Sequence, residues 1–175
     1  MNNEPICPSI IGSLEAIEQS LTLCEKLDHT SYNFKAVPHV QSSIGEHLRH
    51  ILDMFLALMN QSNIGVIDYD HRRRGDPVES NLSVGVSELS DVKVWLCKLT
   101  SQQLDSPVTI LSEATISTQK ICEMTSTLRR ELLFVSSHTI HHLAIIKVIT
   151  THCDIETNEH LGYAPATATY LRGQA

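Results

Sequence analysis

The sequence predicts an all-α protein, a four-helix bundle with a small β-hairpin before the last long helix. Four long segments carry apolar residues at intervals of three and four, which is the spacing of an amphipathic helix. Polar or proline-containing stretches separate these segments. The chain has 175 residues, of which 42% are hydrophobic, and this is enough to bury one core without disulfides. We therefore expect a single domain over residues 1–175, with its core at about 9–152 and a tail at 153–175.

The first two predicted helices lie at Ser9–Leu27 and Ser43–Asn60. Ser43 and Glu46 have the S-x-x-E spacing of a capping box, which satisfies free amide groups at a helix start. The stretch 28–41 between the two helices contains a proline and is expected to be a loop. The apolar stripe of the first helix consists of Ile10, Leu14, Ile17, Leu21 and Cys24.

The next elements are a polar connection at 61–80 and a third helix at Asn81–Leu104. A proline then breaks the helical pattern. Two short β-like runs, 108–110 and 120–124, surround a polar stretch and are expected to pair as a small hairpin.

The last predicted helix, Leu128–His152, carries the most informative pattern in the chain. Ser126 or Thr127 is expected to cap it. Three histidines occupy five positions here, and His138 and His142 lie four residues apart. Residues four apart share one face of a helix, so both imidazoles can bind the same divalent metal ion. Two histidines alone leave such a site short of a ligand.

The missing ligand is expected from the predicted helix at Ser43–Asn60. This helix carries His47 and His50 beside its apolar stripe. Two helices with inward histidines can form a three-histidine site in the core of a bundle. From the residues alone, either His47 or His50 can be the third ligand. The alternative is that all these histidines make ordinary hydrogen bonds at the edge of the core.

Composition argues against several classes of partner. The formal net charge is −7 and the pI is about 5.7, whereas a general nucleic-acid binder needs a basic face. No apolar run approaches the roughly 20 residues that span a bilayer, and the N-terminus lacks the features of a signal peptide. We therefore expect a cytoplasmic protein with no nucleic-acid or membrane partner.

The cysteines form no C-x-x-C pair, which predicts neither disulfides nor a zinc ribbon. They are Cys7, Cys24, Cys97, Cys122 and Cys153.

A histidine in the second helix, followed by H-x-x-x-H in the last long helix, resembles the DinB family of metal-dependent enzymes. The motifs are Ser43…His50-Ile51-Leu52 and His138-Thr139-Ile140-His141-His142. The resemblance covers about residues 9–152. It implies a four-helix bundle with one divalent metal ion, zinc or nickel in the first place and iron or manganese otherwise. It also implies that His50, His138 and His142 are the ligands, with positions left open for water or substrate.

Two features depart from the family pattern. Many relatives have Arg-Gly-Gln after the last ligand, where this chain has Leu143-Ala144-Ile145. The second helix also lacks the tryptophan that often precedes the capping residue. A role for that arginine in substrate handling therefore does not carry over to this chain.

Four further residues are candidates for the surroundings of the metal. His47 and His141 are alternative ligands or partners of the ligand rings, and Asp53 could orient an imidazole through its ring N–H. Asp53 could equally be a solvated carboxylate. Glu131, two turns before His138, could act as a general base, although pairing with Arg129 or Arg130 is the alternative.

Three consecutive arginines could bind an anionic substrate. Arg72, Arg73 and Arg74 lie between Asp70 and Asp76 in the polar connection. Guanidinium groups bind carboxylates and phosphates well, but runs of charge are usually solvated or locally paired.

The resemblance implies metal-assisted hydrolysis or thiol S-transfer on a small molecule, itself a thiol or an anion. The alternative is a non-catalytic metal-binding or ligand-sensing bundle, which a fourth ligand such as His47 or His141 would favour. A third interpretation is a helical module without metal. A homodimer is also expected, since small bundles often pair about a twofold axis.

Overall fold

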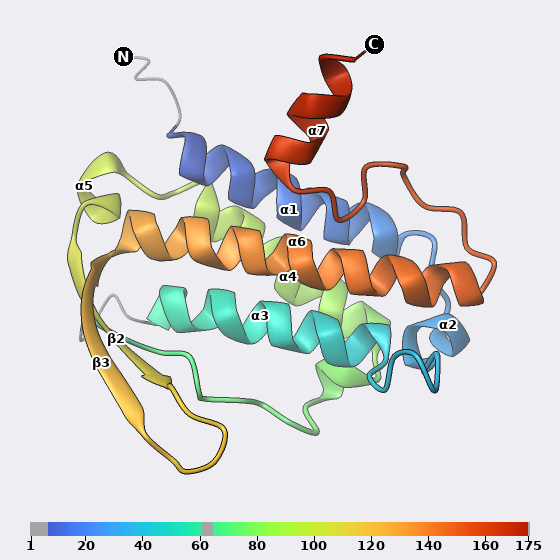
Figure 1. The fold of residues 1–175 in the computed structure, drawn as a ribbon, viewed down its shortest axis with the longest axis horizontal. Helices are drawn as coiled ribbons and strands as arrows, with labels where there is room; N and C mark the ends of the chain where they lie inside the picture. The colour runs from blue at the N-terminus through green and yellow to red at the C-terminus, as the bar shows by residue number, and fades with distance from the viewer. Residues whose placement is uncertain (1–6, 61–64, 175) are drawn as a thin grey trace.

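Four long helices form the centre of this computed structural model, which describes residues 7–60 and 65–174 (Figure 1). They are α1 (Pro8–Cys24), α3 (Ile44–Asn60), α4 (Leu82–Leu96) and α6 (Leu128–His152). α1 and α3 each pack against both α4 and α6, so every long helix contacts two others. The expectation of a mostly helical protein is confirmed. The expectations for the N-terminus and for residues 61–64 concern residues outside this description.

The starts of α3 and α6 follow from capping residues that the sequence predicts. Ser43 Oγ accepts a hydrogen bond from the amide of Glu46 at 3.2 Å, and the amide of Ser43 donates to Glu46 Oε2 at 2.7 Å. The Thr127 side chain accepts from the amide of Arg130. These bonds satisfy amides that have no partner within the first turn of a helix. The expected bounds of the last helix are confirmed.

Apolar side chains on the facing sides of the long helices form the core. Burying one Leu or Ile side chain stabilises the fold by about 1.5–3 kcal/mol. Packing of these faces therefore holds α3 beside α6, which is what the site requires. The fully buried apolar residues of the two helices are Ile44, Leu48, Ile51, Leu52, Phe55, Leu58, Leu132, Val135, Leu143, Ile146 and Ile149.

The helix expected at Asn81–Leu104 is divided in the structure. α4 ends at Leu96, and α5 (Ser101–Leu104) is a separate short helix. Thr100 caps α5, because its hydroxyl accepts from the amide of Gln103 while the Gln103 side chain accepts from the amide of Thr100. A capping box inside the predicted segment therefore starts a new helix.

Two other short helices lie in segments expected to be loops. α2 (His29–Asn33) is capped by Asp28, which accepts from the amide of Ser31 at 2.8 Å. The 3₁₀ helix η2 (Pro77–Glu79) packs against α3 and α4.

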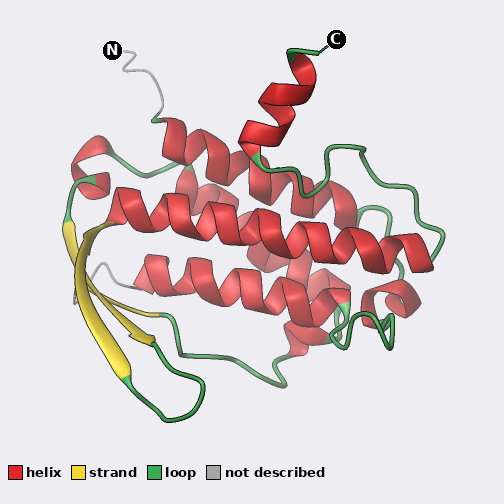
Figure 2. Ribbon diagram, in the orientation of Figure 1, coloured by secondary structure: helices red, strands yellow, loops and turns green. Residues whose placement is uncertain are grey.

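A small sheet covers one end of the long helices (Figure 2). The expected hairpin is present: β2 (Pro107–Glu113) pairs antiparallel with β3 (Ile121–Thr127). A third strand, β1 (Val66–Asp68), pairs parallel with β2 and was not expected. Its three residues are too few to show an alternating pattern.

By length and composition alone, α6 could cross a membrane, although the sequence analysis expected no such segment. Its buried residues lie on the side that packs against α1 and α3, so its place in the helical core accounts for its apolar composition. After α6 the chain returns over α1, where Leu161 is buried, and ends in α7 (Pro165–Arg172).

Candidate metal centre

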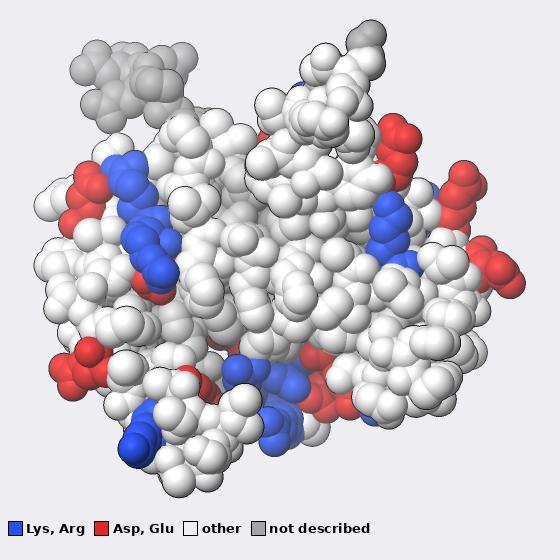
Figure 3. Space-filling view, in the orientation of Figure 1, with Lys and Arg blue, Asp and Glu red and all other residues white. Residues whose placement is uncertain are grey.

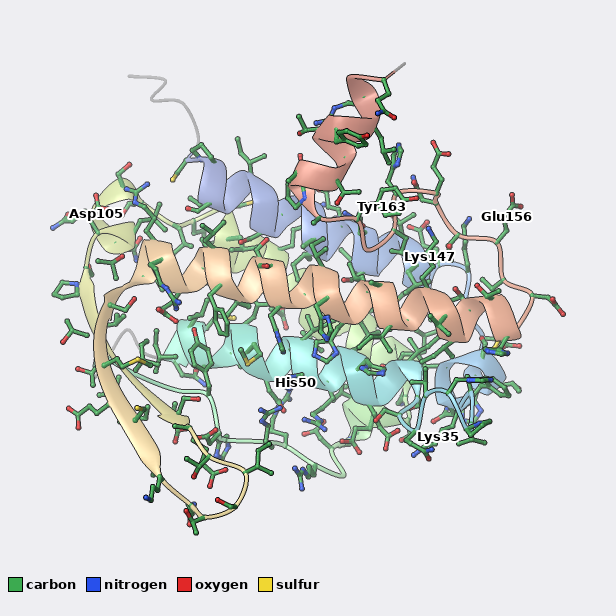
Figure 4. All side chains as sticks on the ribbon, viewed as in Figure 1. Lys35, His50, Asp105, Lys147, Glu156 and Tyr163 are labelled. Atoms are coloured by element: carbon green, nitrogen blue, oxygen red, sulfur yellow. The ribbon has the colours of Figure 1, made fainter. Side chains whose placement is uncertain are left out.

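Three histidines from two helices meet where α3 packs against α6. His50 lies in the middle of α3, beside nitrogen-bearing side chains that lie between the two helices (Figure 4). The Nε2 atom of His138 lies 2.9 Å from Nε2 of His50 and 3.1 Å from Nε2 of His142. One ligand atom from each ring lies within 4.8 Å of the others. The arrangement is compatible with a metal site.

Helix geometry explains why these rings converge. His138 and His142 are one turn apart on α6, and the buried side chains of Thr139 and Leu143 beside them anchor this helix in the core. On α3, His50 lies next to the fully buried Ile51. All three rings are half-buried at the rim of the core. Solvent and small molecules can therefore reach them.

The spacing of the nitrogens is compatible with a shared cation as well as with hydrogen bonds. Nitrogen ligands lie about 2.0–2.1 Å from Zn²⁺, so two of them would be about 2.8–3.4 Å apart for angles between 90° and tetrahedral. The separations of 2.9 and 3.1 Å agree with that range. An imidazole nitrogen carries either one hydrogen or one lone pair, so Nε2 of His138 cannot satisfy both neighbours by hydrogen bonding. One cation would satisfy all three lone pairs.

Burial keeps the three rings neutral at pH 7. Desolvation is the largest cause that lowers the pKa of His50 to about 3, followed by the charge of Arg72. Desolvation also lowers the pKa of His142 to about 2, and it lowers the pKa of His138. Neutral imidazole is the form that offers a lone pair to a metal. The rings thus already have the neutral charge that metal binding requires.

His47 lies on the far side of the His142 ring. Its Nδ1 is 2.9 Å from Nδ1 of His142, whereas the three-histidine cluster involves Nε2 of His142. His47 therefore occupies the place of a partner that orients a ligand ring, and its function there stays a prediction. Its own Nε2 is buried without a hydrogen-bond partner among the described residues. His141 is exposed, and its ring centroid lies 5.4 Å from that of His142.

Asp53 is engaged by arginines. Its carboxylate accepts from Arg49 at 3.0 Å and from Arg73 at 2.7 Å. No hydrogen bond joins it to a histidine within the described part of the chain. Arg73 also forms a two-pronged ion pair with Glu88, at 3.0 and 2.8 Å. Asp53 and Arg73 thus tie the segment after β1 to α3 and α4.

The three consecutive arginines have three different environments. Arg73 is used in the ion pairs with Asp53, Glu88 and Asp76. Arg72 reaches the cluster: its Nη1 contacts Nδ1 of His50 and lies 3.2 Å from Nε2 of the same ring. Arg74 is exposed. The sequence could not predict which arginine has which environment, because all three lie in one uninterrupted run of positive charge.

Glu131 lies in a closed hydrogen-bond network. Its carboxylate is fully buried and accepts from Tyr69 at 2.8 Å, from Ser126 at 2.6 Å and from Arg130 at 2.7 Å. The expected pairing with Arg130 is confirmed. The contact with Tyr69 was not expected. Desolvation, followed by this hydrogen bond, raises the pKa of Tyr69. A role as general base stays a prediction.

Phe134 is a neighbour of the cluster that the sequence analysis missed. Its ring stacks on that of His138 at a centroid distance of 6.0 Å, and its side chain is 39% exposed. It lies one turn before His138 on α6, so the same spacing that pairs the histidines could have identified it.

The fold is DinB-like, which confirms the predicted resemblance at the level of the fold. The crystal structure of the DinB-like protein YjoA from Bacillus subtilis is similar to this chain with a TM-score of 0.59 and 18% identity. The match covers 89% of this chain and 99% of that one.

Comparison at the level of sequence is less extensive. No protein-family model matches the chain. FK506-binding protein 5 from Rhizopus delemar is 27% identical over 111 residues, which is 63% of this chain. The chain spans only 29% of that relative's length.

Proposed function

We propose that this chain is a DinB-like metal-dependent enzyme in which His50, His138 and His142 bind one divalent metal ion. The observation that carries the proposal is the convergence of their three Nε2 atoms between α3 and α6. In this proposal α1, α3, α4 and α6 act as a four-helix bundle, and residues 9–152 form its core. Zinc or nickel is the expected ion, with iron or manganese as alternatives.

The proposed reaction is metal-assisted hydrolysis or S-transfer of a thiol on a small molecule. A divalent ion held by three neutral imidazoles keeps a position open and lowers the pKa of a water or thiol that binds there. The chain's own contribution is to hold the rings neutral and at the rim of the core, where solvent reaches them. Phe134 adds an apolar wall beside His138.

The second candidate is a non-catalytic metal-binding or ligand-sensing protein. It requires a closed set of four ligands, for which His47 and His141 are the available residues. His47 meets His142 through Nδ1, the nitrogen opposite the cluster, and His141 is exposed. The geometry therefore favours an open site, and with it the enzyme. We also propose a cytoplasmic protein that forms a homodimer.

The first test is metal content by plasma mass spectrometry on untagged protein purified without chelator. We expect about one divalent ion per chain, and its loss in His138→Ala with unchanged helix content by circular dichroism. His160→Ala is the matched control, because this histidine is exposed and, among the described residues, its ring pairs with Glu159 and Tyr163 alone. A wild-type protein that binds no ion after incubation with zinc, nickel and manganese would contradict the proposal.

A further inference from the structure

We propose that Arg72, together with the metal centre, binds an oxyanion group of the substrate, a carboxylate or a phosphate. This inference rests on the proposed function, because the metal at His50, His138 and His142 supplies the second positive charge. It names the substrate class: a small molecule that carries an oxyanion close to its reacting group.

Arg72 is the one member of the arginine run that lies at the cluster without an acidic partner. It contacts the ring of His50 and is exposed. Among the described residues it forms no ion pair, whereas the adjacent Arg73 forms three. In the orientation of Figure 1, a patch of Lys and Arg side chains lies at the lower centre of the surface, bordered by Asp and Glu (Figure 3).

The carboxylates near Arg72 are engaged elsewhere. Asp53 accepts from Arg49 and Arg73, and Asp70 accepts from the amide of Glu113 at 2.6 Å. Both carboxylates act on Arg72 through space, but neither forms an ion pair with it among the described residues, so its N–H donors remain available for an anion. An arginine beside a divalent ion places two positive charges close together. A single oxyanion can interact with both charges at once.

Metal binding and anion binding are expected to be coupled through His50. A guanidinium only donates hydrogen bonds, so Arg72 at Nδ1 requires a lone pair on that atom and the ring hydrogen on Nε2. Coordination of a metal through Nε2 requires the opposite tautomer, with the hydrogen on Nδ1. Binding of an ion at Nε2 of His50 would therefore displace Arg72 from this ring and free its N–H groups for an anion.

A partly exposed aromatic ring also borders the cluster. Phe134 stacks on His138 and is 39% exposed, on the α6 side of the cluster, whereas Arg72 approaches from the α3 side. A molecule on the metal can therefore direct an oxyanion to Arg72 and an apolar group to Phe134.

The test uses the full chain loaded with cobalt(II), whose visible spectrum reports the ligands of the metal. Acetate and inorganic phosphate are titrated into the wild type, Arg72→Gln and Arg74→Gln. We expect Arg72→Gln to weaken binding of at least one of the two anions by tenfold or more, while Arg74→Gln matches the wild type. The anion that depends more on Arg72 distinguishes a carboxylate from a phosphate. Cobalt affinity of Arg72→Gln should equal or exceed that of the wild type, because a competitor for His50 is gone.

The outcomes separate this inference from the proposed function. If cobalt does not bind to the wild type, both fail. If cobalt binds and the two arginine variants have equal affinity for both anions, the metal site stands and the Arg72 site is overturned. Arg72→Lys keeps the charge but loses the forked donor, so an anion affinity below that of the wild type, at full cobalt occupancy, supports the inference even if the glutamine variant folds poorly.

Discussion

Nδ1 of His47 lies 2.9 Å from Nδ1 of His142, on the side of the His142 ring that faces away from the three-histidine cluster. If His142 binds a metal through Nε2, its Nδ1 carries the hydrogen and donates it to His47. The contact is therefore compatible with the tautomer of His142 that can act as a ligand.

The first prediction concerns His47→Ala. Loss of an outer partner of a ligand ring typically costs about 10–100-fold in metal affinity, so this variant should still bind metal, but more weakly. His50→Ala should lose far more affinity, since it removes a ligand. Competition with a chromogenic chelator measures both. If His47→Ala is the more damaging of the two, His47 and not His50 is the ligand from α3.

The second prediction is that the metal-free protein loses stability on acidification from pH 7 to pH 5. The pKa values of His50 and His142 are about 3 and 2 in the folded chain, against an ordinary value of 6.5. Below pH 6.5 the unfolded chain binds protons that the folded chain does not bind, so the free energy of unfolding falls as pH falls. Well above pH 6.5 both histidines are neutral in the folded and in the unfolded chain. Their contribution to the free energy of unfolding is then fully retained.

Urea unfolding of chelator-treated protein at several pH values measures this dependence. His142→Gln should flatten the profile between pH 5 and 7, whereas the exposed His160→Gln should leave it unchanged. An identical slope in wild type and His142→Gln would show that His142 is not held neutral by burial.

The third prediction separates the neighbouring arginines by stability. Arg73→Gln leaves the buried carboxylate of Asp53 with one ion-pair partner fewer and also frees Glu88, so we expect a loss of about 2–3 kcal/mol. Arg74→Gln, an exposed control one residue away, should stay within about 0.5 kcal/mol of the wild type. Chemical denaturation of both variants gives the comparison. Equal losses would mean that the ion pairs of Arg73 add nothing to the fold.

The fourth prediction addresses the role of Glu131. Its buried carboxylate accepts from Tyr69, Ser126 and Arg130, so Glu131→Gln should destabilise the protein by about 1–3 kcal/mol and leave metal affinity unchanged. Thermal unfolding and metal titration test this, with exposed Glu123→Gln as the control. A variant of normal stability that loses metal-dependent turnover would instead establish Glu131 as a catalytic residue.

The fifth prediction compares two helical glycines. A Cβ on Gly45 would collide with the backbone oxygen of Glu79 and with the ring of Tyr32, whereas a Cβ on Gly12 would meet only Ser136 Oγ at an ordinary 3.8 Å. Gly45→Ala should therefore cost about 1–3 kcal/mol or more. Gly12→Ala should stabilise α1 by about 0.5–1 kcal/mol, since alanine is the better helix former. A neutral Gly45→Ala would show that η2 can move away from α3.

Local patterns predicted the long helices well. The capping box at Ser43 and the run from Leu128 to His152 depend on neighbours three and four residues away, so their helix starts are visible in the sequence. The short elements were harder. β1 is a strand only because its three residues pair with β2, and α5 is separate because a capping box at Thr100 competes with continuation of α4.

What the sequence determined by itself is the pair His138 and His142, because helical periodicity alone places two residues four apart on one face. Which residues surround that pair depended on the tertiary structure. The packing of α3 against α6 brings His50 to Nε2 of His138 and leaves His47 behind His142. Arg73 forms ion pairs with Asp53 and Glu88, whereas the adjacent Arg72 contacts the ring of His50. These outcomes depend on distances between segments far apart in the chain, for which the sequence carries no periodic signal.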